Sequence, residues 1–151
     1  MTSLATPPET TTLLATFFLG ESAFAVNAGV VQEVIRLGAV TPVRHSPPEV
    51  AGVINLRGRI VTLLDTGLIL GAQPALRDRD SRILVMEDRG EFLGLLVDRM
   101  GEVIEAAPET SAPLPANIPP AQARFFSGVC RSGGRVLTLL NPVELLNGVS
   151  S

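Results

Sequence analysis

The sequence is poor in the residues on which several common functions depend. Its 151 residues include one cysteine, one histidine and six phenylalanines, but no tryptophan or tyrosine. A single cysteine excludes an intramolecular disulfide and is typical of a reducing compartment. With a net charge of −3 and few aromatic rings, the chain has no basic stripe and few stacking platforms, which argues against nucleic acid as a partner.

Long apolar runs are also missing. No stretch approaches the ~18 consecutive apolar residues of a membrane helix. The N-terminal residues lack a charged segment followed by an apolar core, so we expect neither membrane insertion nor a signal peptide. Charged residues make up only 18% of the chain and apolar residues 46%, so much of it is expected to be core or interface. These features predict a cytoplasmic protein.

The residues that usually carry catalysis or bind metals are isolated from one another. His45 has no cysteine or second histidine near it, so no metal site is expected. No P-loop or dinucleotide fingerprint indicates a cofactor, and serine-histidine-aspartate catalysis lacks its Gly-x-Ser-x-Gly elbow. Cys130 lies within a predicted strand, where a small buried hydrophobe is its expected role.

What the sequence does have is a repeat. Residues 52–65 recur 76 positions later as residues 128–141, with seven of fourteen positions identical. Both copies place a glycine-containing break between apolar runs rich in strand-forming residues, which predicts a β-hairpin in each. A fainter pairing relates Phe24 and Glu33-Val34-Ile35 to Phe92 and Glu102-Val103-Ile104. The repeat therefore predicts two similar β modules.

Short strands and few helices are predicted along the chain. Residues 1–12 are rich in threonine and proline and predict a disordered tail before a single domain at 13–148. Sign-alternating charges near 71–82 predict a connector between the modules, and the prolines of 108–120 predict an extended loop. Strands are predicted at 14–19, 23–26, 37–43, 52–56, 59–64, 83–86, 92–97, 102–106, 125–130 and 135–140. Helical turns are predicted at 30–35, 46–49, 66–70 and from Asn141 to Gly148. The pattern favours barrels or a sandwich.

One segment has the form of a catalytic signature. Leu63-Leu64-Asp65-Thr66-Gly67 matches the pattern of aspartic proteases, in which two carboxylates share a proton. The repeat supplies Asn141-Pro142-Val143 where a second motif would lie, so catalysis would require a retropepsin-like homodimer. An aspartate at the end of a strand is also an ordinary helix N-cap. Both interpretations of Asp65 stay open at this point.

The same region resembles the CheW family, the adaptor proteins of bacterial chemotaxis. The resemblance centres on residues 52–58 and extends to 31–35, Asp65, Val97-Asp98-Arg99 and 140–146. It implies an all-β fold with a few short helices, in which two SH3-like five-stranded β-barrels pack over a shared core. The chain departs from the family pattern at Thr62, where proline is usual, and at Thr66-Gly67, where leucine and arginine are usual.

The resemblance also implies a non-enzymatic adaptor with two kinds of partner. These are the cytoplasmic helical tip of chemoreceptors (methyl-accepting proteins) and the regulatory domain of a CheA-type histidine kinase. A cytoplasmic protein recruited to membrane-associated receptor arrays is implied, in control of chemotaxis or of type IV pili. Matching positions place the receptor contact at Glu33, Asn55 and Arg57. They place the kinase contact at Ile35, Leu37, Val40 and Val43.

Each of these residues also has a purely structural interpretation. Arg57 at a hairpin tip is a solvated turn residue. Glu33 would pair with Arg36 across one helical turn, an interaction worth only about 0.2–0.5 kcal/mol. The amide of Asn55 can satisfy the backbone of a tight hairpin. The four apolar residues of the kinase contact have the character of core or strand positions.

Overall fold

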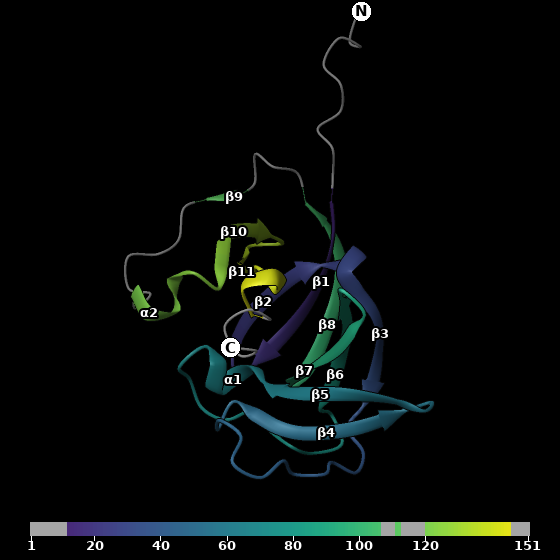
Figure 1. The fold of residues 1–151 in the computed structure, drawn as a ribbon. Coiled ribbons are helices and arrows are strands. Elements are labelled where there is room, and N and C mark those ends of the chain that lie inside the picture. The colour runs from purple at the N-terminus through teal and green to yellow at the C-terminus, as the bar shows by residue number, and fades with distance from the viewer. Residues whose placement is uncertain (1–11, 107–110, 113–119, 146–151) are drawn as a thin grey trace, which may run out of the picture.

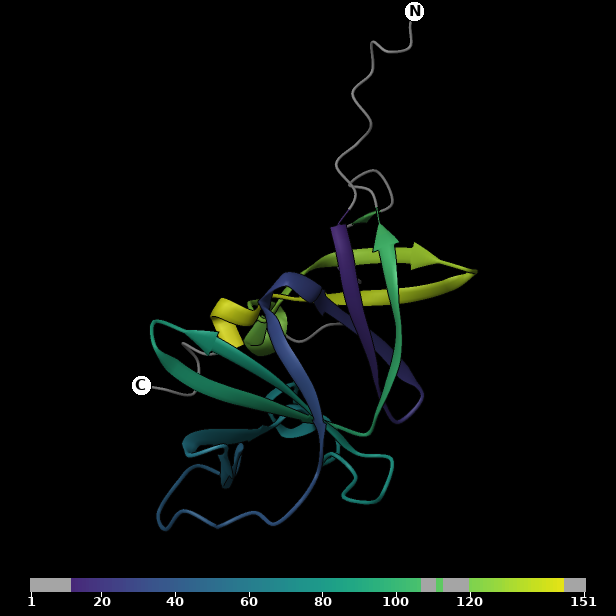
Figure 2. The same ribbon diagram turned by 90° about the vertical axis from the view of Figure 1, so that its right-hand side faces the viewer.

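The computed structural model describes residues 12–106, 111–112 and 120–145. They form an all-β fold with a few short helices, and the strands make two sheets (Figure 1 and Figure 2). The first sheet has the strand order β8-β1-β2-β11-β10-β9, and the second has the order β3-β6-β7-β5-β4. Because β9 has only two residues, each sheet has five main strands. The predicted fold class is confirmed.

The first sheet takes strands from both ends of the chain. Its strands are β1 (Thr12–Leu19), β2 (Ser22–Asn27), β8 (Arg99–Ala106), β9 (Ser111–Ala112), β10 (Phe126–Ser132) and β11 (Arg135–Leu140). The second sheet consists of β3 (Val31–Arg36), β4 (Val50–Leu56), β5 (Arg59–Asp65), β6 (Arg82–Asp88) and β7 (Glu91–Val97). Helical segments are η2 (Ala28–Val30), α1 (Thr66–Ile69) and α2 (Pro120–Ala123), and residues 142–145 form a further helical turn. Thr12, which the sequence assigned to the tail, is the first residue of β1 and pairs with Ala106 of β8. The rest of the predicted tail, residues 1–11, lies outside the described residues.

The two halves of the chain do not each form one sheet. The hairpin β1–β2 belongs to the first sheet, but β3 crosses to the second and pairs with β6. The hairpin β6–β7 belongs to the second sheet, and β8 crosses back to pair with β1. The segment 71–81, predicted to connect the modules, therefore links α1 to β6 within the second sheet. A sequence repeat carries no information on this exchange of strands.

The sequence repeat corresponds to a structural repeat. β5 pairs in parallel with β7, and β11 pairs in parallel with β2, so the hairpins β4–β5 and β10–β11 occupy equivalent places. Each hairpin has a register shift at a glycine, Gly52 with φ 144° and Gly128 with φ 157°. A side chain at Gly52 would meet the carbonyl oxygen of Thr41 at 2.4 Å. Close backbone approach therefore accounts for the glycine at position 52.

Two of the predicted helical turns are wrong. Residues 31–36 form the strand β3, whose side chains alternate between half-buried and exposed with the period of a strand. Its β-branched residues suit a pleated sheet, and pairing with β6 overrides the local helical spacing. Residues 46–49 form no helix. The Val50 N–H donates to the Pro47 carbonyl at 3.0 Å, which closes a single turn, and β4 begins at Val50.

The strand predicted at 37–43 is reduced to a single bridge. The N–H and carbonyl of Thr41 exchange bonds of 2.9 and 2.8 Å with Val53 of β4. Gly38 weakens a strand and Pro42 removes a backbone donor, so the ladder does not extend to either side. The segment meets the outer edge of β4 at this one point.

The main hydrophobic core draws on strands of both sheets. Phe17 is completely buried and stacks on Phe24, with ring centroids 5.7 Å apart, and Phe24 stacks on Phe126 at 6.4 Å. A smaller cluster lies within the first sheet and includes Leu14 and Cys130, which is buried as predicted. Leu63, Leu84 and Leu95 of the second sheet belong to the same core and are completely buried, so burial of apolar side chains from both sheets holds the sheets together.

A buried carboxylate joins the two sheets. The Oδ2 atom of Asp98 accepts a 2.6 Å bond from the N–H of Gly20, in the β1–β2 turn. Its Oδ1 atom accepts a 2.7 Å bond from the N–H of Leu76, in the segment 71–81. The neighbouring N–H, of Ala75, donates to Oδ1 of Asp65 at 3.0 Å. Two carboxylates therefore anchor this segment.

Candidate functional site

A two-residue turn, Arg57-Gly58, joins β4 to β5, and Arg57 is exposed there. Arg57 and Gly58 both have positive φ, 50° and 84°, as a type I′ turn requires. The side chain of Asn55 shapes the turn, because its Oδ1 accepts a 3.0 Å bond from the N–H of Gly58. The structural interpretation of Asn55 is therefore confirmed.

An ion pair links the β4–β5 turn to β3, the strand at the opposite edge of the second sheet from β4. Arg57 Nη2 donates to Oε1 of Glu33, although β4 and β3 lie at opposite edges of the sheet. The sheet is therefore curled enough to bring the β4–β5 turn within side-chain reach of β3, as in a small barrel. The Arg57 side chain is 70% exposed and that of Glu33 is 32% exposed. The helical pairing of Glu33 with Arg36 is wrong, because residues three apart on a strand point to opposite faces.

A cleft of about 260 Å³ opens beside this ion pair, and we call it the edge cleft. Its lining residues are Gln32, Glu33, Leu56, Arg57, Arg59, Val61, Val85 and Phe92. The Arg59 guanidinium carbon lies 4.5 Å from the centroid of the Phe92 ring. Sequence reasoning placed Glu33 and Arg57 together at one site but missed Arg59 and Phe92. The available signal was the position of Arg59 at the start of the repeated strand, two residues after Arg57.

The four residues predicted to contact the kinase lie in β3 and in the segment that follows it. Ile35, Leu37 and Val40 are half-buried and pack against the main core. Val43 differs, because 43% of its surface is exposed. Of these four residues, Val43 is therefore the most accessible from solvent.

The Asp65-Thr66-Gly67 segment has a structural role. Oδ1 of Asp65 caps α1 by accepting a 3.1 Å bond from the N–H of Leu68. Asp65 is only 2% exposed, whereas a homodimeric catalytic dyad needs carboxylates on the surface that meets the partner. A side chain at Gly67 would meet the carbonyl oxygen of Gln73 at 2.0 Å. Capping and close packing account for the motif, and this geometry gives the protease alternative no support.

A substitution at Thr66 tests whether the Asp65-Thr66-Gly67 segment serves the fold. It is buried, and its hydroxyl has no hydrogen-bond partner among the residues that the structure describes. Thr66→Val keeps the shape and removes an unsatisfied polar group, so we expect the free energy of unfolding to rise by about 1 kcal/mol. The midpoint of thermal unfolding, followed by circular dichroism, should rise by roughly 2–4 °C. The exposed Thr41→Val is the control, and a lower midpoint for Thr66→Val would contradict the assignment.

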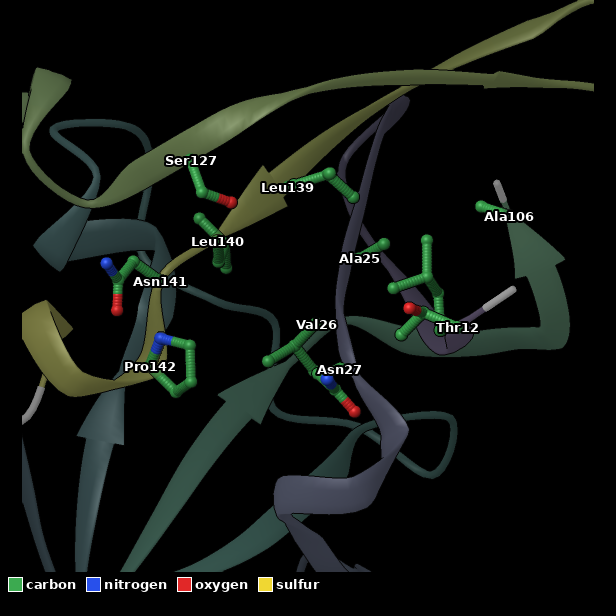
Figure 3. A pocket seen from close by; sticks show the side chains of 11 residues that line it. Thr12, Ala25, Val26, Asn27, Ala106, Ser127, Leu139, Leu140, Asn141 and Pro142 are labelled. Atoms are coloured by element: carbon green, nitrogen blue, oxygen red, sulfur yellow. The ribbon is translucent and has the colours of Figure 1, made fainter. Parts of the chain in front are cut away.

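A second hollow, of about 300 Å³, lies against the first sheet (Figure 3). Its lining residues are Thr12, Leu14, Ala25, Val26, Asn27, Ala106, Ser127, Leu139, Leu140, Asn141 and Pro142. Oδ1 of Asn141 is already used, because it accepts a 3.1 Å bond from the N–H of Val143 and caps a helical turn at residues 142–145, as predicted. The predicted end of this helix at Gly148 lies outside the described residues. Among the described residues that line it, none is a histidine, a cysteine or a charged residue. The described part of the lining therefore offers no acid–base pair of the kind that an active site uses.

Neither a metal-binding cluster nor a membrane-spanning helix is found among the described residues. In the described parts of the chain, no group of three or more histidine, cysteine, aspartate or glutamate side chains could hold a metal ion. No helix over those same residues has the length and apolar character needed to cross a membrane.

Comparison with known proteins identifies the family. The model of the CheW-like domain matches residues 14–150. The chain belongs to the CheW-like domain family. The probable chemotaxis protein CheW of Rhizobium etli is 30% identical over 138 residues, which are 91% of this chain and 89% of that protein. Protein PilI of Pseudomonas aeruginosa is 30% identical over 117 residues, 75% of this chain and 64% of that protein.

A solved CheW structure has the same fold. The crystal structure of the scaffolding protein TtCheW from Thermoanaerobacter tengcongensis matches with a TM-score of 0.80 at 26% identity, over 89% of this chain and 91% of that chain. The departures from the family pattern fit within this CheW-like fold. Thr62 pairs with Val53 of β4 and Leu93 of β7, and Thr66-Gly67 begin α1.

Proposed function

We propose that this CheW-like protein is a non-enzymatic adaptor that couples chemoreceptor tips to the regulatory domain of a CheA-type histidine kinase. Family membership supports the scaffold role, and the edge cleft supports a site for protein binding. The observation that carries the proposal is the ion pair of Arg57 and Glu33 at this cleft, because it brings together two of the residues expected to meet the receptor. Recruitment to receptor arrays from the cytoplasm follows from this role.

Chemotaxis is the pathway that the relatives favour. The CheW of Rhizobium etli is matched over 89% of its length, whereas PilI is matched over 64%. Control of type IV pili is the second candidate, and the similarity to PilI is the observation that supports it. Deleting the gene separates the two, since loss of swimming chemotaxis with normal twitching motility indicates the first.

The binding proposal is tested with purified proteins. We expect the wild-type chain to bind a chemoreceptor cytoplasmic fragment and a kinase regulatory domain, separately and together, in isothermal titration calorimetry and size-exclusion chromatography. Simultaneous binding requires that the two surfaces be distinct. Failure to bind either partner would contradict the adaptor role.

The kinase surface has its own prediction. We expect Val43→Glu to weaken binding of the kinase regulatory domain by about tenfold, because a carboxylate replaces an exposed apolar contact. Binding of the receptor fragment should be unchanged. Val103→Glu is the matched control, since Val103 is a valine on the other sheet, 60% exposed. Equal kinase affinity for Val43→Glu and wild type in calorimetry would remove Val43 from this surface.

A further inference from the structure

We propose that Arg59 is the specificity-determining residue of the edge cleft and that it pairs with a carboxylate on a helix of the bound receptor. This inference rests on the proposed function, because it names the chemistry by which that surface recognises its partner. Arg59 is exposed at the start of β5 and lines the cleft beside Arg57.

The charges that line the edge cleft leave one positive charge uncompensated. Glu33 pairs with Arg57, and the other charged residue of the described lining is Arg59. Among the described residues no carboxylate pairs with Arg59, whose guanidinium lies instead over the ring of Phe92. A guanidinium over an aromatic face is held in place while its N–H donors remain available at the edge. The cleft therefore presents a positioned cation that lacks an anion.

The other lining residues suit an aliphatic side chain. Leu56, Val61, Val85 and Phe92 form the apolar part of the cleft, and Val61 and Val85 are buried. A helix displays side chains three and four residues apart on one face. Such a helix can place an aliphatic side chain against the apolar part and a carboxylate one turn away, at Arg59. An aliphatic and acidic helix face is thus the partner that this lining complements.

Desolvation makes the carboxylate a requirement. A partner that covers the cleft removes water from Arg59, and a buried cation without an anion is strongly unfavourable. Arg57 does not create the same requirement, because Glu33 already compensates its charge. Selection among helices therefore depends on Arg59 more than on Arg57.

The structural repeat supplies a natural comparison in the first sheet. Arg135 is the counterpart of Arg59, and its guanidinium carbon lies 5.1 Å from the centroid of Phe18. Arg99 lies over the same ring at 4.1 Å. Arg135 lines a hollow of about 340 Å³ together with Glu102.

The hollow beside Arg135 has the same kind of stacked arginine but a different charge pattern. Gly133 stands at the position of Arg57, so the counterpart of the ion pair is absent and Glu102 faces the hollow without that arginine. A carboxylate in the lining repels the carboxylate of a partner helix. Arg135→Gln is therefore a matched control for Arg59→Gln, with the same change in chemistry and in net charge.

The test compares the affinity of a chemoreceptor cytoplasmic fragment for four proteins, the wild type, Arg59→Gln, Arg59→Lys and Arg135→Gln, over a range of salt concentrations. We expect Arg59→Gln to bind about tenfold more weakly than the wild type, since a charge-assisted hydrogen bond is lost. Its affinity should also depend less on salt. Arg59→Lys should keep the salt dependence while losing the bidentate contact, and Arg135→Gln should bind like the wild type.

Each other outcome has a distinct meaning. A wild type that does not bind the fragment would overturn the proposed function and the inference with it. A wild type that binds, with Arg59→Gln equal to it in affinity and salt dependence, would overturn the inference alone. Equal losses in Arg59→Gln and Arg135→Gln would also overturn it, because a general charge effect would then suffice. Thermal unfolding of all four proteins excludes loss of the fold as the cause.

Discussion

Asp98→Ala is expected to lower the free energy of unfolding by about 3 kcal/mol, because two hydrogen bonds to a buried carboxylate are lost at once. The two donors are the backbone N–H groups of Gly20 and Leu76, which belong to different parts of the fold. Removing the carboxylate leaves both donors without this acceptor and releases the β1–β2 turn from the segment 71–81. The midpoint of thermal unfolding should fall by roughly 6–12 °C for a chain of this length.

Two further variants make this prediction specific to the carboxylate. Asp98→Asn keeps one acceptor oxygen and replaces the other with an amide that cannot accept, so about half of the loss is expected. Asp80→Ala removes an exposed aspartate from the same segment and should change the free energy of unfolding by less than about 0.5 kcal/mol. An Asp98→Ala protein that melts within a degree of the wild type would show that these bonds do not contribute to stability.

Local sequence signals predict the hairpins and the helix caps of this fold. Gly52 and Gly128 mark equivalent bulges, and the Arg57-Gly58 break marks a tight turn. Asp65 and Asn141 accept bonds from the backbone of the turns that they precede. In each case the responsible atoms lie within a few residues of one another, so a short window of sequence contains the physical cause.

Long-range pairing explains what the sequence does not predict. Residues 31–36 have apolar spacing compatible with a helix, and only the presence of β6 alongside them makes them a strand. The exchange of β3 and β8 between the sheets has the same origin. No local pattern distinguishes it from two modules placed one after the other.

The candidate site, too, was predicted from the sequence only in part. The resemblance to the CheW family placed Glu33 and Arg57 at one surface, and the structure brings their side chains into contact across 24 residues of sequence. The stacking of Arg59 on Phe92 was not predicted, because it depends on which residues of β5 and β7 lie side by side when these two strands pair. Residues that strand pairing brings into one cleft have no shared sequence pattern by which they could be recognised.

Arg57→Glu is expected to weaken binding of the chemoreceptor fragment by about a hundredfold, the largest effect on binding that this site predicts. The substitution breaks the ion pair with Glu33 and places two carboxylates side by side at the edges of the second sheet. They repel each other, which opposes closure of the sheet, and they repel the carboxylate that Arg59 is proposed to bind. Calorimetry measures the affinity, and binding of the kinase regulatory domain serves as the control that should not change.

Exchanging the two charges distinguishes the contribution of the ion pair to binding from the contributions of Arg57 and Glu33 individually. The double variant Arg57→Glu, Glu33→Arg restores an opposite-charge pair across the two edges and leaves Arg59 as the uncompensated cation. Its affinity should therefore return to within about fivefold of the wild type, a residual cost of roughly 1 kcal/mol. Each single variant should bind more weakly than the double variant, because coupled charges give non-additive effects. A double variant as weak as Arg57→Glu would mean that the Arg57 guanidinium itself contacts the receptor, and it would shift the determinant of specificity from Arg59 to Arg57.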